Sequence, residues 1–177
     1  MEHCNITHYN DELPHVFDID IGDNIFGRDT SDPISSMNMA FAPAIDAKVP
    51  WAAILGNHDQ ESTLSRREVM EYITKLDHTL SQVYPQVNGS RMMDIAGFGN
   101  YHLEVKGVLG SPFENKSVLN LYMLDSGDYS KIRNINGYGW IQESQKKWFL
   151  ELTNQLKVGC WSETCLFTYS KSCTKLL

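Results

Sequence analysis

The sequence predicts an α/β fold made of a strand–helix–strand unit, two later strands and a C-terminal helix. Its length of 177 residues suits one domain with a hydrophobic core and is short for two. Hydrophobic residues make up 42% and charged residues 21%, which is ordinary for a folded globular protein. Segments with the period of a strand and of a helix follow one another in the first half of the chain. These observations favour a sheet covered by helices.

The strand–helix–strand unit runs from the first clear strand pattern to a short apolar run. Residues 15–21 alternate apolar and polar side chains, which is the period of a strand. Asp32 can then cap a helix whose first turn holds Pro33. This helix has an apolar stripe at fourfold spacing, formed by Met37, Phe41 and Ile45. The apolar run over 49–55 predicts a second, buried strand.

Each of these two strands ends in polar residues. Gly22-Asp23-Asn24 follows the first strand, and Gly56-Asn57-His58-Asp59 follows the second. Consecutive strands of such a unit are normally parallel and leave the sheet at the same edge, so we expect Asp23 to meet residues 57–59 in space. Open α/β sheets bind ligands at this edge. Gly, Asn and Asp are also ordinary turn residues, so a plain turn remains the alternative when these residues are considered alone.

The second half of the chain predicts a helix, two strands and a last helix. Ser65 and Glu68 have the spacing of a capping box, ahead of a helix that reaches about residue 76. Strand patterns over 98–105 and 118–124 are joined by a polar loop, which favours an antiparallel pair. A final helix is expected over 141–156. His78 and His102 match no motif and are expected to be structural or solvated, and turn roles are expected for Asp125 and Asp128 at a strand exit, rather than metal binding.

The two ends of the chain differ from this central part. We expect residues 1–14 to be poorly ordered, residues 15–157 to form the domain, and residues 158–177 to be a divergent, disordered tail without a clean period. Three of the four cysteines lie in the last eighteen residues, and no Cys-x-x-Cys pair is present. This pattern favours free thiols over a disulfide framework or a structural zinc site.

The charge of the chain narrows the classes of partner. A net charge of −7 argues against a general nucleic-acid binder or a protein that binds anionic membranes, because both normally carry a basic face. No apolar run approaches the roughly 20 residues of a membrane span. We therefore expect neither nucleic acid nor a membrane span.

Four blocks of the sequence resemble the calcineurin-like metallophosphoesterases. They lie at residues 22–27, 50–66, 97–101 and 124–130. The longer similarity is to plant purple acid phosphatases of the small single-domain group, which includes members labelled inactive, and to related yeast-type phosphatases. It covers about residues 16–156 and rests above all on the Gly-Asn-His-Asp block with its flanks. The resemblance implies a partial metallophosphoesterase β-sandwich flanked by helices.

The resemblance also implies roles for particular residues. Members of the family hold two divalent or trivalent metal ions, such as iron, zinc or manganese. Asp23 matches the carboxylate that bridges the ions, and Asn57 matches an amide ligand to one of them. His58 matches the residue that contacts the phosphate or protonates the leaving group, and Asp59 would hold its imidazole in the needed tautomer. The implied substrate is a phosphorylated small molecule or a phosphoprotein.

The printed sequence departs from the family pattern in three places. The family has an upstream Asp-containing block before Gly22-Asp23, and it has a lone His and a Gly-His-x-His block downstream, whereas no histidine follows His102 here. Phe26 stands where purple acid phosphatases have an iron-binding Tyr. The expected function is a metal-dependent phosphoester hydrolase with an incomplete dinuclear site. The alternative is an inactive, truncated member that acts as a binding or regulatory protein. A structural domain would require the other three matching blocks to be accidental.

The expected location depends on the same resemblance. The first residues hold no basic segment followed by an apolar one, so the chain as it stands is expected in the cytoplasm. Asn5, Asn88 and Asn115 each begin an N-glycosylation acceptor triplet. These triplets suggest a secretory ancestry, and a secreted or vacuolar protein if the full-length family member has a signal.

Overall fold

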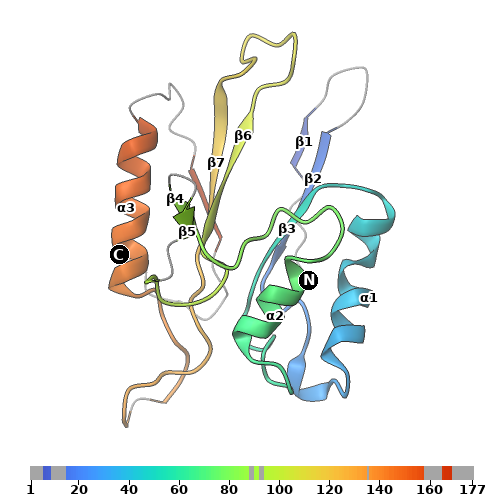
Figure 1. Ribbon diagram of the computed structural model, residues 1–177, viewed down its shortest axis with the longest axis vertical. Helices are drawn as coiled ribbons and strands as arrows, with labels where there is room; N and C mark the ends of the chain where they lie inside the picture. The colour runs from blue at the N-terminus through green and yellow to red at the C-terminus, as the bar shows by residue number, and fades with distance from the viewer. Residues whose placement is uncertain are drawn as a thin grey trace.

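Two small sheets lie between helices in the computed structural model, which describes residues 6–8, 15–87, 90–91, 94–134, 136–157 and 165–168. The first sheet contains β1 (Ile6–His8), β2 (His15–Ile21) and β3 (Trp51–Ile54). The second contains β6 (Tyr101–Lys106), β7 (Ser117–Met123) and β8 (Cys165–Thr168). Helices α1 (Pro33–Asp46) and α2 (Arg66–Ile73) lie beside the first sheet, and α3 (Glu143–Lys157) lies beside the second (Figure 1). The α/β class predicted from the sequence is confirmed.

The strand–helix–strand unit forms as the sequence predicts. Strands β2 and β3 are parallel, in a register that runs from Asp18 opposite Trp51 to Ile21 opposite Ile54. Between them, α1 begins where the Asp32 side chain accepts hydrogen bonds from the backbone N–H groups of the first turn. The apolar stripe of α1 faces the sheet, and the ring of Phe41 stacks on Trp51 with centroids 4.4 Å apart. Burial of this stripe fixes the helix against the sheet.

The second half also follows its local signals. Ser65 and Glu68 form the predicted capping box, in which each side chain bonds to the other residue's backbone N–H. Strands β6 and β7 are antiparallel, with a register shift near Val105. Three short elements complete the described chain: a 3₁₀ turn (Gly27–Asp29) and the ribbon of β4 (Gln86–Val87) and β5 (Ser90–Arg91).

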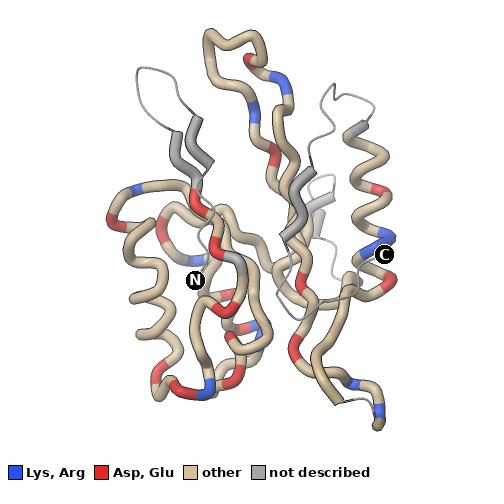
Figure 2. Tube along the Cα trace, turned by 180° about the vertical axis from the view of Figure 1, so that it is seen from behind, with Lys and Arg blue, Asp and Glu red and all other residues tan. Residues whose placement is uncertain are grey.

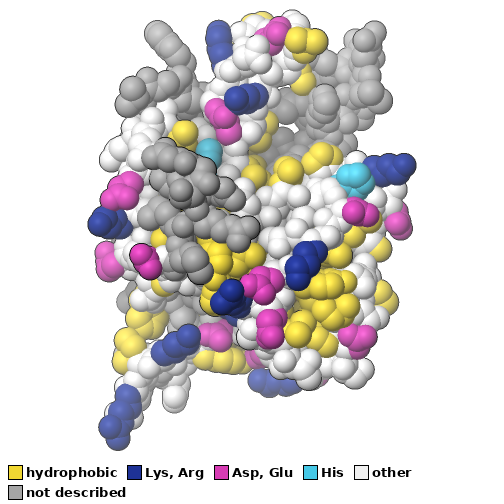
Figure 3. Space-filling view, viewed as in Figure 1, with side chains coloured by type: hydrophobic (Ala, Val, Ile, Leu, Met, Phe, Trp, Pro, Cys, Tyr) yellow, Lys and Arg dark blue, Asp and Glu magenta, His cyan; other side chains and the backbone are white. Residues whose placement is uncertain are grey.

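One hydrophobic core joins the two sheets. Ile19 and Leu55 from the first half pack in the same buried cluster as Tyr101 and Leu121 from the second. The hydroxyl of Tyr101 donates a hydrogen bond of 2.7 Å to the carbonyl oxygen of Ala53. Each fully buried side chain of this size contributes about 1.5–3 kcal/mol, so the shared core holds the sheets together. On the face that Figure 3 shows, hydrophobic side chains gather between the two halves and over the helices of the first half.

A second, smaller cluster lies under α3. Its fully buried members are Ile95, Leu124, Ile141 and Trp148. Phe149 and Leu152 of α3 pack against this cluster, which confirms the apolar face expected for the last helix. The cluster fixes the chain that leaves β7 and leads to α3.

The ends of the chain depart from the sequence expectation at two short segments. The sequence predicts disorder over 1–14 and 158–177, whereas residues 6–8 form β1 and residues 165–168 form β8. Strand β1 pairs antiparallel with β2, and β8 pairs parallel with β7. Residues 165–168 include Phe and Thr, which favour strands. The rest of both ranges lies outside the described residues.

Charged residues are spread over both halves of the described trace (Figure 2). Acidic positions occur in the loops of both halves, and basic positions are scattered among them. Among the described residues, no helix combines the length and the apolar character that crossing a bilayer requires.

Candidate functional site

The two polar strand exits meet, as the sequence predicts. The backbone N–H of His58 donates a hydrogen bond of 3.1 Å to Oδ1 of Asp23, and Gly22 N donates to the carbonyl oxygen of Ile54 at 3.1 Å. Asp23 has a positive φ of 50°, a conformation that Asp tolerates better than most residues. A Cβ on Gly56 would overlap the backbone nitrogen and Oδ1 of Asp23. Glycine at position 56 is therefore what allows the two loops to approach.

Asp59 joins the same two loops from the inside. Its carboxylate is buried and accepts hydrogen bonds from Gly56 N at 2.6 Å, Ile25 N at 2.9 Å and Asn24 Nδ2 at 3.4 Å. Burial raises the pKa of Asp59 to about 6, against the opposing effect of the two backbone donors. In the described structure this carboxylate contacts these loop donors rather than the imidazole of His58. Asp59 thus joins the two loops, and its predicted orienting role stays a prediction.

Glu61 is the carboxylate that contacts the imidazole. Its Oε2 lies 2.8 Å from Nδ1 of His58, and its side chain is only 7% exposed. The hydroxyl of Tyr129 donates to Oε1 of the same carboxylate, and Arg28 approaches it at 3.5 Å. The hydrogen bond from Tyr129 lowers the pKa of Glu61, with a further contribution from His58, and the Glu61 contact raises the pKa of Tyr129. Glu61 thus remains an anion beside the ring.

Sequence reasoning missed both Glu61 and Tyr129 as site residues. The position of Glu61 carried a signal, because it follows His58 by three residues and the backbone N–H of Glu61 bonds to the carbonyl oxygen of His58 at 3.1 Å. A turn of this kind brings the two side chains to the same side of the loop. Tyr129 lies 68 positions beyond Glu61, and no local pattern indicated the contact.

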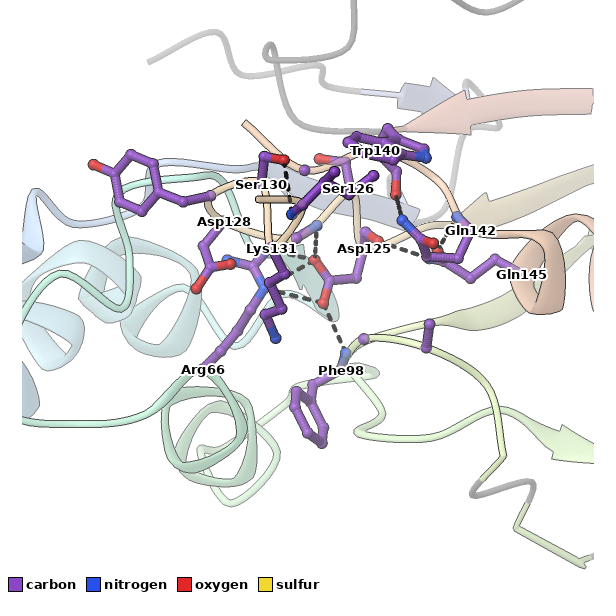
Figure 4. Close-up of a pocket in the computed structure, with 16 residues that line it drawn as sticks. Arg66, Phe98, Asp125, Ser126, Asp128, Ser130, Lys131, Trp140, Gln142 and Gln145 are labelled. Atoms are coloured by element: carbon purple, nitrogen blue, oxygen red, sulfur yellow. Dashed lines mark hydrogen bonds and ion pairs between the residues drawn. The ribbon is translucent and has the colours of Figure 1, made fainter. Parts of the chain in front are cut away.

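A buried ion pair ties this loop to the exit of β7. The guanidinium of Arg66 donates to both carboxylate oxygens of Asp125, from Nε at 2.9 and 3.0 Å (Figure 4). It also donates to the carbonyl oxygens of Leu55 and Gly56. Asp125 in turn accepts the backbone N–H groups of Phe98 and Gly127. The turn role expected for Asp125 is confirmed by the Gly127 contact. The pairing with Arg66, which the sequence did not indicate, links the two halves.

A cavity of about 420 Å³ opens beside this ion pair. Arg66, Asp125 and Gln145 line it together with residues 96–98, 126–132, 139–140 and 142 (Figure 4). Asp128 lines the cavity, and Tyr129, which holds Glu61, lines it as well. The loop after β7 therefore touches both the cavity and the surroundings of His58.

The histidines expected to be structural have structural contacts. Nε2 of His102 lies 2.8 Å from Oδ1 of Asn120, and its ring packs on Tyr122. The carbonyl oxygen of His78 accepts the backbone N–H of Trp51 at 3.1 Å. These contacts serve the sheets rather than the strand-exit site.

The described residues do not fit a two-metal centre by themselves. Asp23 and Asn57 are the two residues that match metal ligands, and Asn57 is buried with an Nδ2 that has no hydrogen-bond partner within the described structure. Over that same part of the chain, no group of three or more His, Cys, Asp or Glu side chains is placed to hold a metal ion. Catalytic metal sites generally use about three protein ligands per ion. Asp23 and Asn57 alone fall short of that number.

Comparisons with known proteins agree with the sequence blocks at the site. The chain is 56% identical over 136 residues to "Probable inactive purple acid phosphatase 29" of Arabidopsis thaliana, which is 77% of this chain and 34% of the relative. It is 48% identical over 139 residues to "Probable inactive purple acid phosphatase 14" of the same plant, with the same shares. It is 36% identical over 133 residues to "Phosphatase DCR2" of Saccharomyces cerevisiae, covering 72% of this chain and 21% of that protein.

The plant relatives are longer than this chain. The chain spans about a third of the length of the plant relatives it matches. No family model and no solved structure matches it. The matched region includes most of the chain. These similarities support a metallophosphoesterase-like fragment that resembles the purple acid phosphatases and their phosphatase relatives.

Proposed function

We propose that this protein acts on phosphomonoesters as a metal-dependent hydrolase of the acid phosphatase or protein phosphatase type, with His58 at the reacting phosphate. The observation that carries the proposal is the double anchoring of His58. Its backbone is bound to Asp23, and its imidazole is bound to Glu61. The family to which the relatives belong supports the same reaction class.

His58 has the geometry of a proton donor or phosphate contact. Glu61 takes Nδ1, so the Nε2 atom is the nitrogen that can face a substrate oxygen. A side chain in this role gives a proton to the leaving group as the phosphorus–oxygen bond breaks, and such assistance is commonly worth about 10²–10⁴-fold in rate. With the Nδ1–H directed at the Glu61 carboxylate, Nε2 carries a proton to give only in the imidazolium form of His58, so that form is the proton donor, and Glu61 keeps its ring in one orientation. The alcohol or phenol then leaves as a neutral molecule.

Hydrolysis requires more than the residues described above. Family members use two metal ions of the iron, zinc or manganese type, and Asp23 and Asn57 do not suffice to hold such a pair. Turnover therefore depends on ligands beyond these two residues. This requirement makes metal dependence the sharpest test of the proposal.

The test is a phosphomonoesterase assay with added manganese, zinc or iron. We expect turnover to depend on metal and to be lost in Asp23→Asn, which keeps the shape and the acceptor for His58 N but removes the charge. Asp46→Asn is the matched control, because Asp46 is exposed at the end of α1. Turnover that Asp23→Asn leaves unchanged would contradict the proposal.

A second candidate is a protein that binds a phosphorylated ligand without hydrolysing it. The shortage of metal ligands among the described residues favours it, and two relatives bear names that call them probably inactive. Its partner would be a phosphorylated small molecule or a phosphoprotein. Binding of a phosphomonoester that depends on His58, with no turnover under any metal, would decide for this candidate.

A further inference from the structure

The loop that joins β6 to β7 projects at one end of the molecule, at the top of Figure 1. It covers residues 107–116 and folds back on itself through its own backbone. The N–H of Lys116 donates to the carbonyl oxygen of Phe113 at 2.9 Å, and the N–H of Gly107 donates to the carbonyl oxygen of Lys116 at 2.9 Å. A Cβ on Gly107 would overlap the backbone of Phe113. These contacts hold a tight turn over residues 113–116.

Polar side chains of this loop also bond within it. The Ser111 hydroxyl accepts the backbone N–H of Phe113 at 3.2 Å. The Glu114 carboxylate accepts the backbone N–H of Gly110 at 2.9 Å. Asn115 differs from them, because it is exposed and its side chain makes no hydrogen bond to any residue that the structure describes. The turn therefore leaves the Asn115 amide free to react with a group from outside the chain.

The backbone conformation explains only part of the presence of asparagine at this position. Asn115 has a φ of 59°, in the left-handed region that Gly, Asn and Asp tolerate best. Gly or Asp could not, however, begin the triplet Asn115-Lys116-Ser117, which fits the acceptor pattern for an N-linked glycan. Such a bulky group requires a surface position, which the projecting loop provides. The other two acceptor triplets begin at Asn5 and Asn88, which lie outside the described residues.

An exposed aromatic ring stands beside this acceptor. Phe113 is 59% exposed and lies two residues before Asn115 in the same turn. One face of a pyranose sugar carries C–H groups, and packing of that face on an aromatic ring removes apolar surface from water. Phe113 is therefore placed to receive the first sugar of a glycan on Asn115.

We propose that Asn115 is an N-glycosylation site and that the first sugar of its glycan packs on the ring of Phe113. A cellular transferase joins Nδ2 of Asn115 to C1 of a lipid-linked oligosaccharide. The bond from C1 to the pyrophosphate oxygen breaks, the amide nitrogen loses one proton to a base, and the lipid pyrophosphate leaves. The proposal is independent of the proposed function, because this loop precedes β7 whereas the exit at Asp125 follows it.

The first test identifies the modified positions. The whole chain is expressed in plant cells behind a cleavable secretion leader, recovered from whole cells, and freed of N-glycans by a glycosidase in heavy-oxygen water. This treatment turns each glycosylated Asn into labelled Asp, which peptide mass spectrometry locates. We expect label at Asn115, lost in Ser117→Ala and kept in Ser117→Thr, which restores the hydroxyl. An unlabelled Asn115 in the wild type, or label that survives Ser117→Ala, would overturn the proposal.

The second test measures the packing on Phe113. Removal of the glycans should lower the Tm of the wild type by about 2–4 °C more than that of Asn115→Asp, which carries only glycans at other positions. This difference should vanish in Phe113→Ala. Leu109→Ala is the matched control and should keep it, because Leu109 is 87% exposed in the same loop but lies outside the 113–116 turn. A difference that persists in Phe113→Ala, or none in the wild type, would overturn the packing.

Discussion

Nδ1 of His58 lies 2.8 Å from Oε2 of Glu61, and this contact gives the Gly-Asn-His-Asp loop its oriented imidazole. The orienting carboxylate stands three residues after the histidine, whereas the adjacent Asp59 is occupied by loop N–H groups. Because Glu61 contacts the imidazole and Asp59 contacts loop N–H groups, we expect different effects from replacing each of them.

Replacing Glu61 with Gln should impair the site without unfolding the protein. The amide removes the charge that holds the imidazole and weakens the contact with Tyr129, so we expect a loss of about 10- to 100-fold in turnover or in His58-dependent phosphomonoester binding. The ring nitrogen signals of His58 in NMR spectra should shift in the same variant. Glu71→Gln, an exposed acid of α2, is the control. Unchanged His58 signals in Glu61→Gln would contradict the orienting role.

Asp59 should give stability a dependence on pH. Burial raises the pKa of Asp59 from 3.8 to about 6, so between these values the folded protein keeps a proton that the unfolded chain has released. The stabilising contribution is therefore complete below about pH 4 and is lost as the pH rises through about 6, for a total of about 3 kcal/mol. Urea unfolding between pH 4 and 7 should show this slope.

The comparison for Asp59 is Asp59→Asn, which cannot ionise. The unfolding free energy of Asp59→Asn should lack the pH-dependent contribution between pH 4 and 7. The control Asp46→Asn, at an exposed position, should keep that contribution. The new side-chain amide also places an N–H against one of the loop N–H donors, which leaves that donor without an acceptor. This should lower the unfolding free energy by about 1–3 kcal/mol at every pH. Parallel pH curves for the wild type and Asp59→Asn would contradict the raised pKa.

The Arg66–Asp125 pair should be coupled and strongly stabilising. Each single replacement, Arg66→Met or Asp125→Ala, leaves a buried charge without its partner, and we expect a loss of about 3–5 kcal/mol in unfolding free energy. The double variant should lose less than the sum of the two. Arg67→Met and Glu71→Ala break an exposed pair on α2 and should cost about 0.5 kcal/mol or less. Additive losses at Arg66 and Asp125 would contradict the coupling.

Local signals in the sequence predicted the parts of the fold that depend on residues close together in the chain. The caps at Asp32 and Ser65 were found because a capping residue and its partner are two or three positions apart. The meeting of Asp23 and His58 followed from the direction of parallel strands. These inferences needed no knowledge of distant contacts.

The contacts that the sequence did not indicate are distant in the chain. Tyr129 reaches Glu61 from the loop after β7, and Arg66 reaches Asp125 across 59 positions. A carboxylate beside a histidine suggests a pair, whereas the turn directs the Asp59 carboxylate toward backbone N–H groups. The packing of both loops decides which donors a buried carboxylate accepts hydrogen bonds from.

Arg66 binds the carbonyl oxygens of Leu55 and Gly56, and it binds the Asp125 carboxylate that also accepts the N–H of Phe98. The loop that carries His58 therefore also connects the two halves of the structure through Arg66. Local opening of either half should release both together, so amide hydrogen exchange at Gly56 and Phe98 should report one common opening free energy. A loss of function in a variant of these contacts can therefore come from loss of stability, and the unfolding free energy of the same variant must be measured to separate the two.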